Sequence, residues 1–355
     1  MARRSPKSQS FPISLFHTLC LVSLIQSSHS APLSSYLVSS FSSPNPRLPF
    51  RLMAVDNTTG DVYIGAEEEI YHLGPDFILR ETVEVGICNI QGSEYIGEQD
   101  KNRLLVIAPA PRERLITCGR CDGYCEIRKL ANITDAEMYY DNTDQIVVKR
   151  EDVSMVGVVA SGNAGASHYL YTGISFTLSF GHPISKFDIT TLRSVQRLES
   201  QIRHETVNYI QVMLETSFIY FAIQLKAEST STVIGRLCLD TTDPNLESYT
   251  QIQIECKDQS GSNYIVIRAA HIGPAGSQLA DSLSISSTDD VMYAVFTKEN
   301  SLPVQSALCL YKMSDIQEKF TQAVVGCITC QSDCDGRSID YLQGSECGAV
   351  SSDCA

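Results

Sequence analysis

The chain has 355 residues, with 27 Lys and Arg against 41 Asp and Glu, so its net charge is −14 at neutral pH. A hydrophobic content of 43% is enough for a sizeable core, which excludes a wholly disordered chain, and the acidic balance argues against nucleic-acid binding, which needs clustered Lys and Arg. Thirteen cysteines and sixteen tyrosines without tryptophan are typical of a strand-rich extracellular protein rather than a cytosolic enzyme.

The first thirty residues predict a signal peptide. Basic residues open the segment, the run from Phe11 to Ile25 is apolar, and small residues precede Ala31. The alternative is a short membrane anchor, but the run is below the roughly 18 residues that a spanning helix needs. We therefore expect residues 1–30 to be removed in the secretory pathway, which takes Cys20 from the thirteen cysteines and leaves an even number.

The segment from Arg51 to Leu73 predicts a β-meander. An apolar strand leads to a turn at Asn57–Gly60, and a second strand follows in which Val62, Ile64 and Ala66 are expected to alternate with polar partners. A third strand ends at Leu73.

Similar strand pairs recur along the chain at a spacing of about fifty residues. The next unit spans Arg103–Leu130, with its turn at Pro109, Pro111 and Arg112, and others centre near Tyr169, Tyr220 and Tyr293. Small antiparallel sheets repeated in this way predict an all-β fold built as the blades of a propeller. The alternative from the pattern alone is a pair of β-sandwiches.

Two segments carry short helical signals, Ala269–Leu283 and Ser314–Val324. In the second, Ile316, Phe320 and Val324 recur every four residues, which predicts a helix lying on the sheets.

The cysteines are the most specific feature of the sequence. Two stretches, CGRCDGYC and CITCQSDC, share a C-x2-C-x3-C spacing that in a cytosolic protein would indicate a thiolate metal site. A secretory address favours disulfides instead, and spacing alone does not choose among the roughly ten thousand pairings. The cysteines beyond the signal peptide are Cys88, Cys118, Cys121, Cys125, Cys238, Cys256, Cys309, Cys327, Cys330, Cys334, Cys347 and Cys354.

Several stretches resemble the sema domains of plexins. Gly235–Cys256 is similar to the crossing from the fourth to the fifth blade, and Ser277–Phe320 is similar to the fifth-blade run that ends in a helix. Upstream, Val62–Leu73 resembles the first-blade strand pair and Leu115–Thr134 the second-blade cysteine loop with its sequon. The resemblance extends over most of the chain from about Phe50 onward.

This resemblance implies a sema-type β-propeller, which has seven blades in the family. This chain covers about five of them, with short helical insertions and several disulfides. We therefore expect residues 31–355 to form a sema domain that is incomplete at its C-terminal end. Residues 326–355 are expected to form the cysteine-rich segment of the fifth-blade insertion.

The resemblance also implies a disulfide pairing. It leaves Cys330 and Cys334 without counterparts, although they are close enough for a local bridge. The implied pairs are Cys118–Cys125, Cys256–Cys309, Cys327–Cys347, Cys238–Cys354 and Cys88–Cys121.

The function implied by the resemblance is extracellular ligand recognition by a plexin-like cell-surface receptor, with a semaphorin-type sema domain as partner in guidance or adhesion. The alternative is a secreted semaphorin-like ligand or soluble decoy. Neither reading involves a nucleic acid, a small-molecule substrate, a metal or a cofactor. The membrane would be reached only through a C-terminal part beyond Ala355.

The sequence offers little support for an enzyme. His204-Glu205 is followed by Asn208 where a zinc-binding HExxH motif needs histidine, and nucleophile-elbow, P-loop and dinucleotide motifs are missing. Asp289 and Asp290 are interpreted as part of a turn. The remaining histidines are expected to be hydrogen-bonded structural residues: His72, His168, His182 and His271.

Two features of the surface complete the predictions. Asn57 and Asn132 lie in N-glycosylation sequons and are expected in loops. Arg193, Arg197 and Arg203 form a basic strip in an otherwise acidic chain. The strip is either a solvated loop or short helix, or a contact surface for an acidic partner near the third and fourth blades.

Overall fold

The structure is a computed structural model. The chain divides into two units, Met1–Ser42 and Ser43–Ala355; in the first, the described residues 39–42 form neither helix nor strand, and all elements below belong to the second. The residues described are 39–45, 48–85, 97, 101–108, 113–119, 125–139, 153–161, 168–177, 184–189, 193–197, 206–215, 217–226, 229–239, 246, 248–299, 301 and 304–328.

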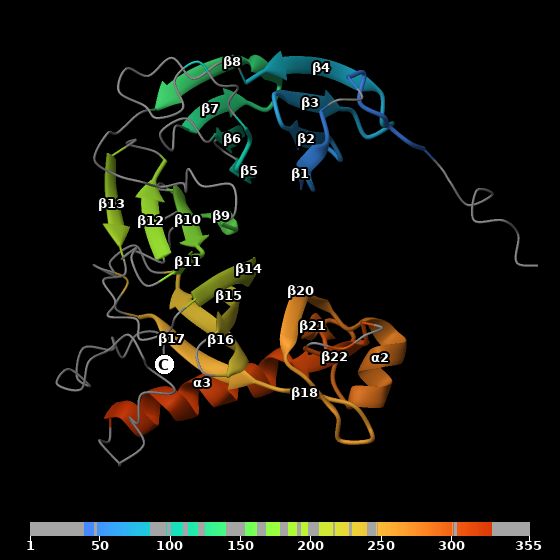
Figure 1. The fold of residues 1–355 in the computed structure, drawn as a ribbon, viewed down its shortest axis with the longest axis vertical. Coiled ribbons are helices and arrows are strands. Elements are labelled where there is room, and N and C mark those ends of the chain that lie inside the picture. The colour runs from blue at the N-terminus through green and yellow to red at the C-terminus, as the bar shows by residue number, and fades with distance from the viewer. Residues whose placement is uncertain are drawn as a thin grey trace, which may run out of the picture. The chain divides into compact units, whose positions relative to one another are not determined.

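The first sheet is a four-stranded antiparallel meander (Figure 1). Its strands are β1 (Phe50–Val55), β2 (Val62–Ala66), β3 (Glu69–Leu73) and β4 (Leu79–Glu84). The predicted turn at Asn57–Gly60 is confirmed: Asp56 and Asp61 close it, and Gly60 has a φ of 80°, a conformation that favours glycine. The predicted alternation in β2 is wrong, because all five of its residues are buried and both faces of this strand are covered.

The second and third sheets also contain four strands each. The second follows the order of the chain, and the third has the order β13-β12-β10-β9. Their strands are β5 (Leu104–Ala108), β6 (Arg114–Cys118), β7 (Cys125–Lys129), β8 (Asn132–Tyr139), β9 (Met155–Ser161), β10 (His168–Ile174), β12 (Ile184–Asp188) and β13 (Arg193–Arg197).

The fourth sheet has the order β11-β14-β15-β16-β17, and the last large sheet has the order β20-β21-β22. A two-stranded ribbon, β18-β19, lies between them in the chain. These strands are β11 (Phe176–Thr177), β14 (Thr206–Glu215), β15 (Phe218–Lys226), β16 (Thr230–Cys238), β17 (Thr250–Ile254), β18 (Cys256–Lys257), β19 (Asn263–Tyr264), β20 (Val266–Pro274), β21 (Asp290–Thr297) and β22 (Ser306–Lys312).

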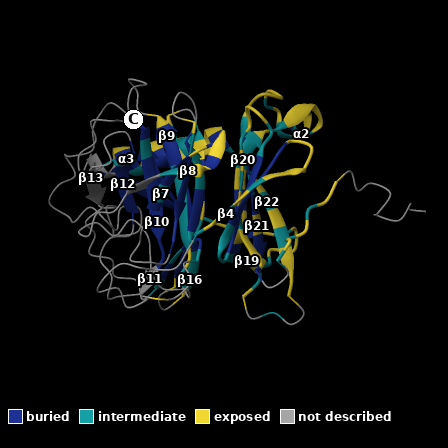
Figure 2. Cartoon of the chain, turned by 90° about the horizontal axis from the view of Figure 1, so that it is seen from above, coloured by how far each residue is buried: buried dark blue, intermediate teal, exposed yellow. Residues whose placement is uncertain are grey.

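The repeat predicted from the sequence is confirmed. One strand of each large sheet contacts its counterpart in the neighbouring sheet, in the order β1, β5, β9, β14 and β20. These strands begin at residues 50, 104, 155, 206 and 266. Figure 2 shows the buried residues gathered on the strands of the middle sheets, whereas helix α2 (Gly276–Leu283) is largely exposed. The described part of the chain is therefore all-β, with few helices.

Apolar clusters join each sheet to the next, which explains why many strands are buried on both faces. Representative members are Tyr63, Ile70 and Leu115 between the first and second sheets, Leu104, Ile116 and Leu170 between the second and third, Tyr171, Val207 and Phe221 between the third and fourth, and Tyr220, Met292 and Phe296 between the fourth and last.

Two tyrosine rings lie directly over a glycine, one between the third and fourth sheets and one within the fourth sheet. A Cβ atom on Gly173 would lie 2.5 Å from a ring carbon of Tyr209, and one on Gly235 would lie 2.4 Å from the hydroxyl oxygen of Tyr249. Only glycine lets backbone and ring approach so closely.

Buried polar side chains also tie neighbouring sheets together. Asn102, before β5, donates from Nδ2 to the carbonyl oxygens of Ala66 and Glu69 in the first sheet, at 2.8 and 3.3 Å. Gln224 on β15 accepts from the backbone N–H of Ile267 on β20 at 3.0 Å. These bonds satisfy backbone groups at sheet junctions, where unpaired ones would be costly.

The helical predictions are partly confirmed. The signal at Ser314–Val324 corresponds to helix α3 (Met313–Ile328), in which Ile316, Phe320 and Val324 are buried. Ile316 and Phe320 pack against the fourth and last sheets. The signal at Ala269–Leu283 is wrong in its first part, because residues up to Pro274 belong to strand β20 and only the remainder forms α2. The apolar residues of this first part belong to β20, which ends at Gly273 and Pro274.

Candidate protein-interaction surface

The basic strip begins on an edge of the third sheet. Arg193 and Arg197 are the first and last residues of β13, which among the described strands pairs with β12 alone. This part of the strip is therefore a strand, and the prediction of a loop or short helix for it is wrong. The side chains of β13 and all of Arg203 lie outside the described residues.

Strand β12, with which β13 pairs, is held in the sheet by a buried lysine. Lys186 on β12 is buried, and its ammonium group lies 4.6 Å from the ring centre of Tyr169 and 5.9 Å from that of Tyr171, both on β10. Such cation–π contacts favour a buried cation and hold β12 against β10. Register then places Arg197 opposite Ser185 and Gln196 opposite Lys186.

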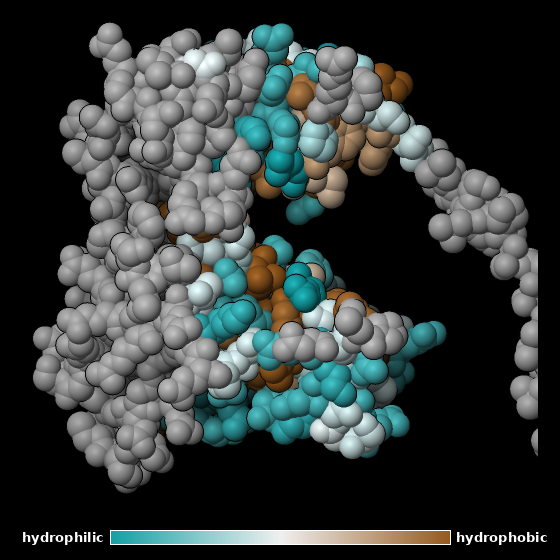
Figure 3. Space-filling model, viewed as in Figure 1, coloured by the Kyte–Doolittle hydropathy of each residue, from teal (hydrophilic) through white to brown (hydrophobic). Residues whose placement is uncertain are grey.

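Two exposed apolar patches lie on other parts of the molecule. One is the turn between β3 and β4, where Phe77, Ile78 and Leu79 are exposed in succession; Figure 3 shows hydrophobic surface at this β4 end of the first sheet. Phe77 has a φ of 61°, an unusual backbone conformation for a phenylalanine.

The second patch is the outer face of the last sheet. Leu308 on β22 lies opposite Val295 on β21, and Leu310 lies opposite Tyr293. Leu308 is 62% exposed and Leu310 is 40% exposed, whereas Leu104 and Leu170, which lie between the second and third sheets, are buried. This face is apolar sheet surface that the described residues leave in solvent.

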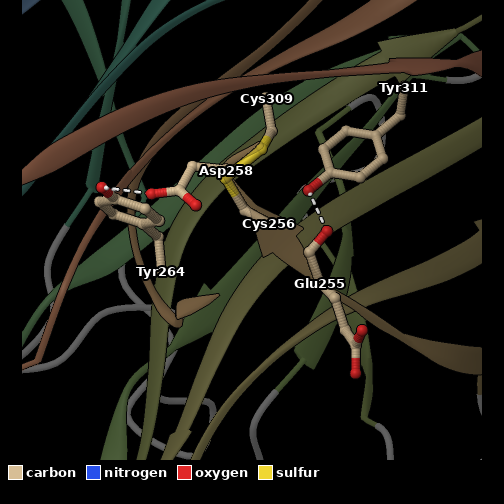
Figure 4. Close-up of a disulfide and its surroundings, with 6 residues drawn as sticks. All are labelled: Glu255, Cys256, Asp258, Tyr264, Cys309 and Tyr311. Atoms are coloured by element: carbon tan, nitrogen blue, oxygen red, sulfur yellow. Dashed lines mark hydrogen bonds between the residues drawn. A yellow bond between two sulfur atoms is a disulfide. The ribbon is translucent and has the colours of Figure 1, made fainter. Parts of the chain in front are cut away.

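The structure contains two of the disulfides that the plexin resemblance implies. Cys118 and Cys125 join directly paired positions of β6 and β7, and Cys256 joins Cys309 across β18 and β22. Around the second, Tyr311 donates a hydrogen bond to the carbonyl oxygen of Glu255 at 2.9 Å (Figure 4). Burial and then the Glu255 carboxylate raise the pKa of Tyr311 to about 12.

Cys238 is also disulfide-bonded. Its implied partner Cys354 lies outside the described residues, as do Cys88, Cys121, Cys330, Cys334 and Cys347. Cys327 belongs to the last turn of α3, but its side chain is likewise not described. The pairing of these cysteines stays a prediction.

The two sequons differ in their surroundings. Asn57 is exposed in the β1–β2 turn, as expected. Asn132 is exposed too, but it is the first residue of β8 rather than part of a loop. Its side-chain oxygen accepts from the backbone N–H of Thr134 at 3.0 Å and from the hydroxyl of Thr134 at 2.5 Å. Glycosylation of both residues stays a prediction.

The described histidines are either exposed or buried. His271 is exposed on β20, whereas His168 and His72 are buried. The expectation of a hydrogen-bonded His72 is wrong: neither ring nitrogen makes a hydrogen bond, and the ring stacks on Tyr63 at 4.7 Å between two carboxylates. His182 and His204 lie outside the described residues.

Asp289 and Asp290, the adjacent carboxylates weighed as a possible site, lie at the start of β21. Asp289 closes a turn by accepting from the backbone N–H of Ser286 at 2.9 Å, which confirms the turn predicted for this residue. Asp290 is the first residue of β21, so the turn predicted for it is wrong. Within the described ranges, no group of three or more His, Cys, Asp and Glu side chains is arranged to hold a metal ion. In the same ranges, no helix has the length and apolar character needed to cross a bilayer.

Sequence reasoning missed the polar groups at the sheet junctions. Asn102, Gln224 and the carboxylates around His72 come from positions far apart in the sequence and meet only through strand register. Single polar residues beside apolar strands carry no periodic signal that would reveal such partners.

The chain is similar in sequence to known proteins. A family model described as Sema domain matches residues 267–345. Plexin-B2 of Mus musculus is 24% identical over 325 residues, covering 81% of this chain and 17% of that protein. Plexin-A3 of Homo sapiens is 25% identical over 326 residues, covering 78% and 17%. The chain thus spans about a sixth of the length of these curated relatives.

Solved structures show the same fold. The full extracellular region of plexin A4 matches with a TM-score of 0.62 at 19% identity, over 79% of this chain and 36% of that one. Drosophila Plexin A in complex with Semaphorin 1b matches with a TM-score of 0.53 at 16% identity, over 80% and 55%. Drosophila Semaphorin 1a matches with a TM-score of 0.52 at 17% identity, over 77% and 55%. The chain is therefore similar to plexins over about four fifths of its length, and it has the sema-type β-propeller fold that its sequence predicts.

Proposed function

We propose that this chain is the ligand-recognition part of a plexin-like receptor and binds a semaphorin-type sema domain. The observation that carries the proposal is the likeness, over most of the chain, to curated plexins and to the extracellular region of plexin A4. A solved complex of Drosophila Plexin A with Semaphorin 1b matches as well. The proposal assigns the chain no catalytic chemistry. It places the first thirty residues in a signal peptide and the rest outside the cell.

The β13 edge of the third sheet is our choice for the contact surface. It carries Arg193 and Arg197 on a strand supported by β12, in a chain whose net charge is −14. A local basic strip would attract an acidic patch on the partner, and charges at an interface rim act mainly on the association rate and its salt dependence. Arg203 extends the strip along the sequence.

The test is the kinetics of binding between an immobilised semaphorin sema domain and an ectodomain that contains this chain. Replacing Arg193, Arg197 and Arg203 with Glu is expected to slow association about tenfold or more and to weaken its salt dependence. A matched control reverses Arg80, Lys257 and Lys319, which are exposed on the first sheet, β18 and α3, with the same change in net charge. Equal effects of the two triple variants would remove the strip from the interface, and absence of any semaphorin binding by the wild type would contradict the proposed partner.

A second candidate is a secreted semaphorin-like ligand or soluble decoy, because the fold also matches Drosophila Semaphorin 1a. The similarity in sequence to the curated plexins favours the receptor. Sequencing the transcript beyond Ala355 distinguishes them. A membrane span followed by a cytoplasmic region supports the receptor, whereas an in-frame stop codon supports the secreted form.

A further inference from the structure

His72 on β3 lies inside a cluster of acidic and aromatic groups in the first sheet. Its side chain is 9% exposed and stacks on the Tyr63 ring, with 4.7 Å between ring centres and 14° between planes. Nε2 lies 3.4 Å from Oδ2 of Asp61, and Nδ1 lies 3.6 Å from Oε2 of Glu81. Both nitrogens therefore face carboxylates, one on each side of the ring.

The same cluster connects the first sheet to the β7–β8 hairpin of the second. Oε2 of Glu81 accepts a hydrogen bond from the backbone N–H of Ile133 at 2.9 Å, and the Tyr63 hydroxyl donates to the carbonyl oxygen of Leu130 at 3.0 Å. Ile133 is fully buried. Any change in the position of the Glu81 carboxylate therefore reaches the junction between the two sheets.

The charges around the cluster are negative on the side of the first sheet. Burial and then Asp61, Asp56 and Glu81 raise the pKa of the Tyr63 hydroxyl. The cations of the second sheet nearest in sequence to the turn are already paired, Arg128 with Glu126 and Lys129 with Asp135. Among the described residues, Asp61 and Glu81 form ion pairs with His72 alone.

A neutral imidazole fits this environment poorly. One of its nitrogens carries a lone pair, and here that lone pair faces a carboxylate oxygen. An imidazolium donates from both nitrogens, so it would bond Asp61 and Glu81 together. Asp61 and Glu81 keep about a quarter of their side-chain surface exposed, whereas His72 is buried between them.

We propose that His72 is a proton-operated clamp that tightens the junction between the first and second sheets in mildly acidic surroundings. Histidine is the side chain whose charge ordinarily changes between about pH 5 and 8. Protonation fixes Glu81 from one side while Ile133 holds it from the other.

Hydrogen exchange read by mass spectrometry tests the clamp, because Ile133 N–H reports directly on Glu81. Protection of the peptide containing Ile133, corrected for the intrinsic exchange rate, is expected to increase about two- to fivefold from about pH 7.5 to about pH 5.5. The His72→Gln variant is expected to lose this gain, whereas His271→Gln, which removes an exposed histidine on β20, is expected to keep it.

A second variant covers the case in which His72→Gln does not fold. Asp61→Asn combined with Glu81→Gln keeps the histidine and its stacking on Tyr63 but removes both charges, so it should abolish the gain as well. The proposal is overturned if protection of the Ile133 peptide falls on acidification in the wild type. It is also overturned if the gain is equal in the wild type and in either of these variants.

Discussion

At the scale of single residues, buried amides hold the sheets together. Asn102 is buried and donates to two backbone carbonyl groups of the first sheet, while its Oδ1 accepts from the Thr117 hydroxyl at 3.3 Å. Asn102→Ala is expected to lower the free energy of unfolding by about 1–3 kcal/mol, because it leaves buried carbonyl groups without donors. Urea unfolding measures the loss.

The matched control is Asn263→Ala, at an exposed position of β19. Its effect should stay within about 0.5 kcal/mol. A loss of similar size in both variants would show that Asn102 contributes no more than a surface amide.

Tyr311 makes the free energy of unfolding depend on pH in the alkaline range. Its pKa is raised from 10.0 to about 12, so the folded state keeps the phenol protonated where the unfolded state loses the proton. The corresponding stability is complete below about pH 10 and is lost as the pH rises towards about 12. In urea unfolding across this range, the difference between wild type and Tyr311→Phe should shrink with rising pH. A difference that stays constant from pH 9 upward would contradict the assignment.

At the scale of elements, helix α3 depends on one aromatic side chain. Phe320 is fully buried, its ring centre lies 6.0 Å from that of Tyr220, and the Arg236 guanidinium lies 4.4 Å from it. Phe320→Ala is expected to cost about 3–5 kcal/mol, because it opens a cavity and removes one face of the Arg236 contact. Thermal unfolding followed by circular dichroism measures the change.

Lys319→Ala is the control on the same helix, since Lys319 is exposed and alanine favours a helix. Phe320→Leu keeps part of the volume and should cost less than Phe320→Ala. Equal melting temperatures for the Phe320→Ala and Lys319→Ala variants would mean that α3 is not anchored through this ring.

At the scale of the whole molecule, the exposed outer face of the last sheet governs solution behaviour. Apolar sheet surface in water favours self-association, so residues 31–355 expressed in a secretory host should be retained or should associate with rising concentration. Replacing Leu308 and Leu310 with Thr, which suits an exposed strand, should reduce this association. Sedimentation velocity over a concentration series is the measurement.

Ile78→Thr is the matched control, because Ile78 is 58% exposed on a different part of the molecule. It should leave the association unchanged. A chain extended by further sheets should be monomeric and melt cooperatively. If residues 31–355 are already monodisperse and melt in the same way as the longer chain, the described sheets cap themselves and the prediction is contradicted.

Elements defined by neighbouring residues could be predicted from the sequence, whereas strands and contacts that depend on pairing between distant segments could not. The turn at Asn57–Gly60 and helix α3 follow from neighbouring residues, so the sequence was sufficient for them. The extended backbone of Arg193–Arg197 and the strand that begins at Asn132 depend on pairing with β12 and β7, and polar residues there favour loops by local propensity. The cluster around His72 depends on the packing of two sheets, which no local pattern encodes.

The Cys256–Cys309 disulfide has a mechanical consequence. It closes a loop with a sequence separation of 53 residues that contains β19, β20, α2 and β21. A pulling force applied to the chain on either side of this loop passes through the two sulfur atoms, so the enclosed strands bear none of it. Under oxidising conditions about 180 Å of extended chain therefore stays hidden when the molecule is stretched. A reducing agent would release that length as an additional step in a force–extension trace.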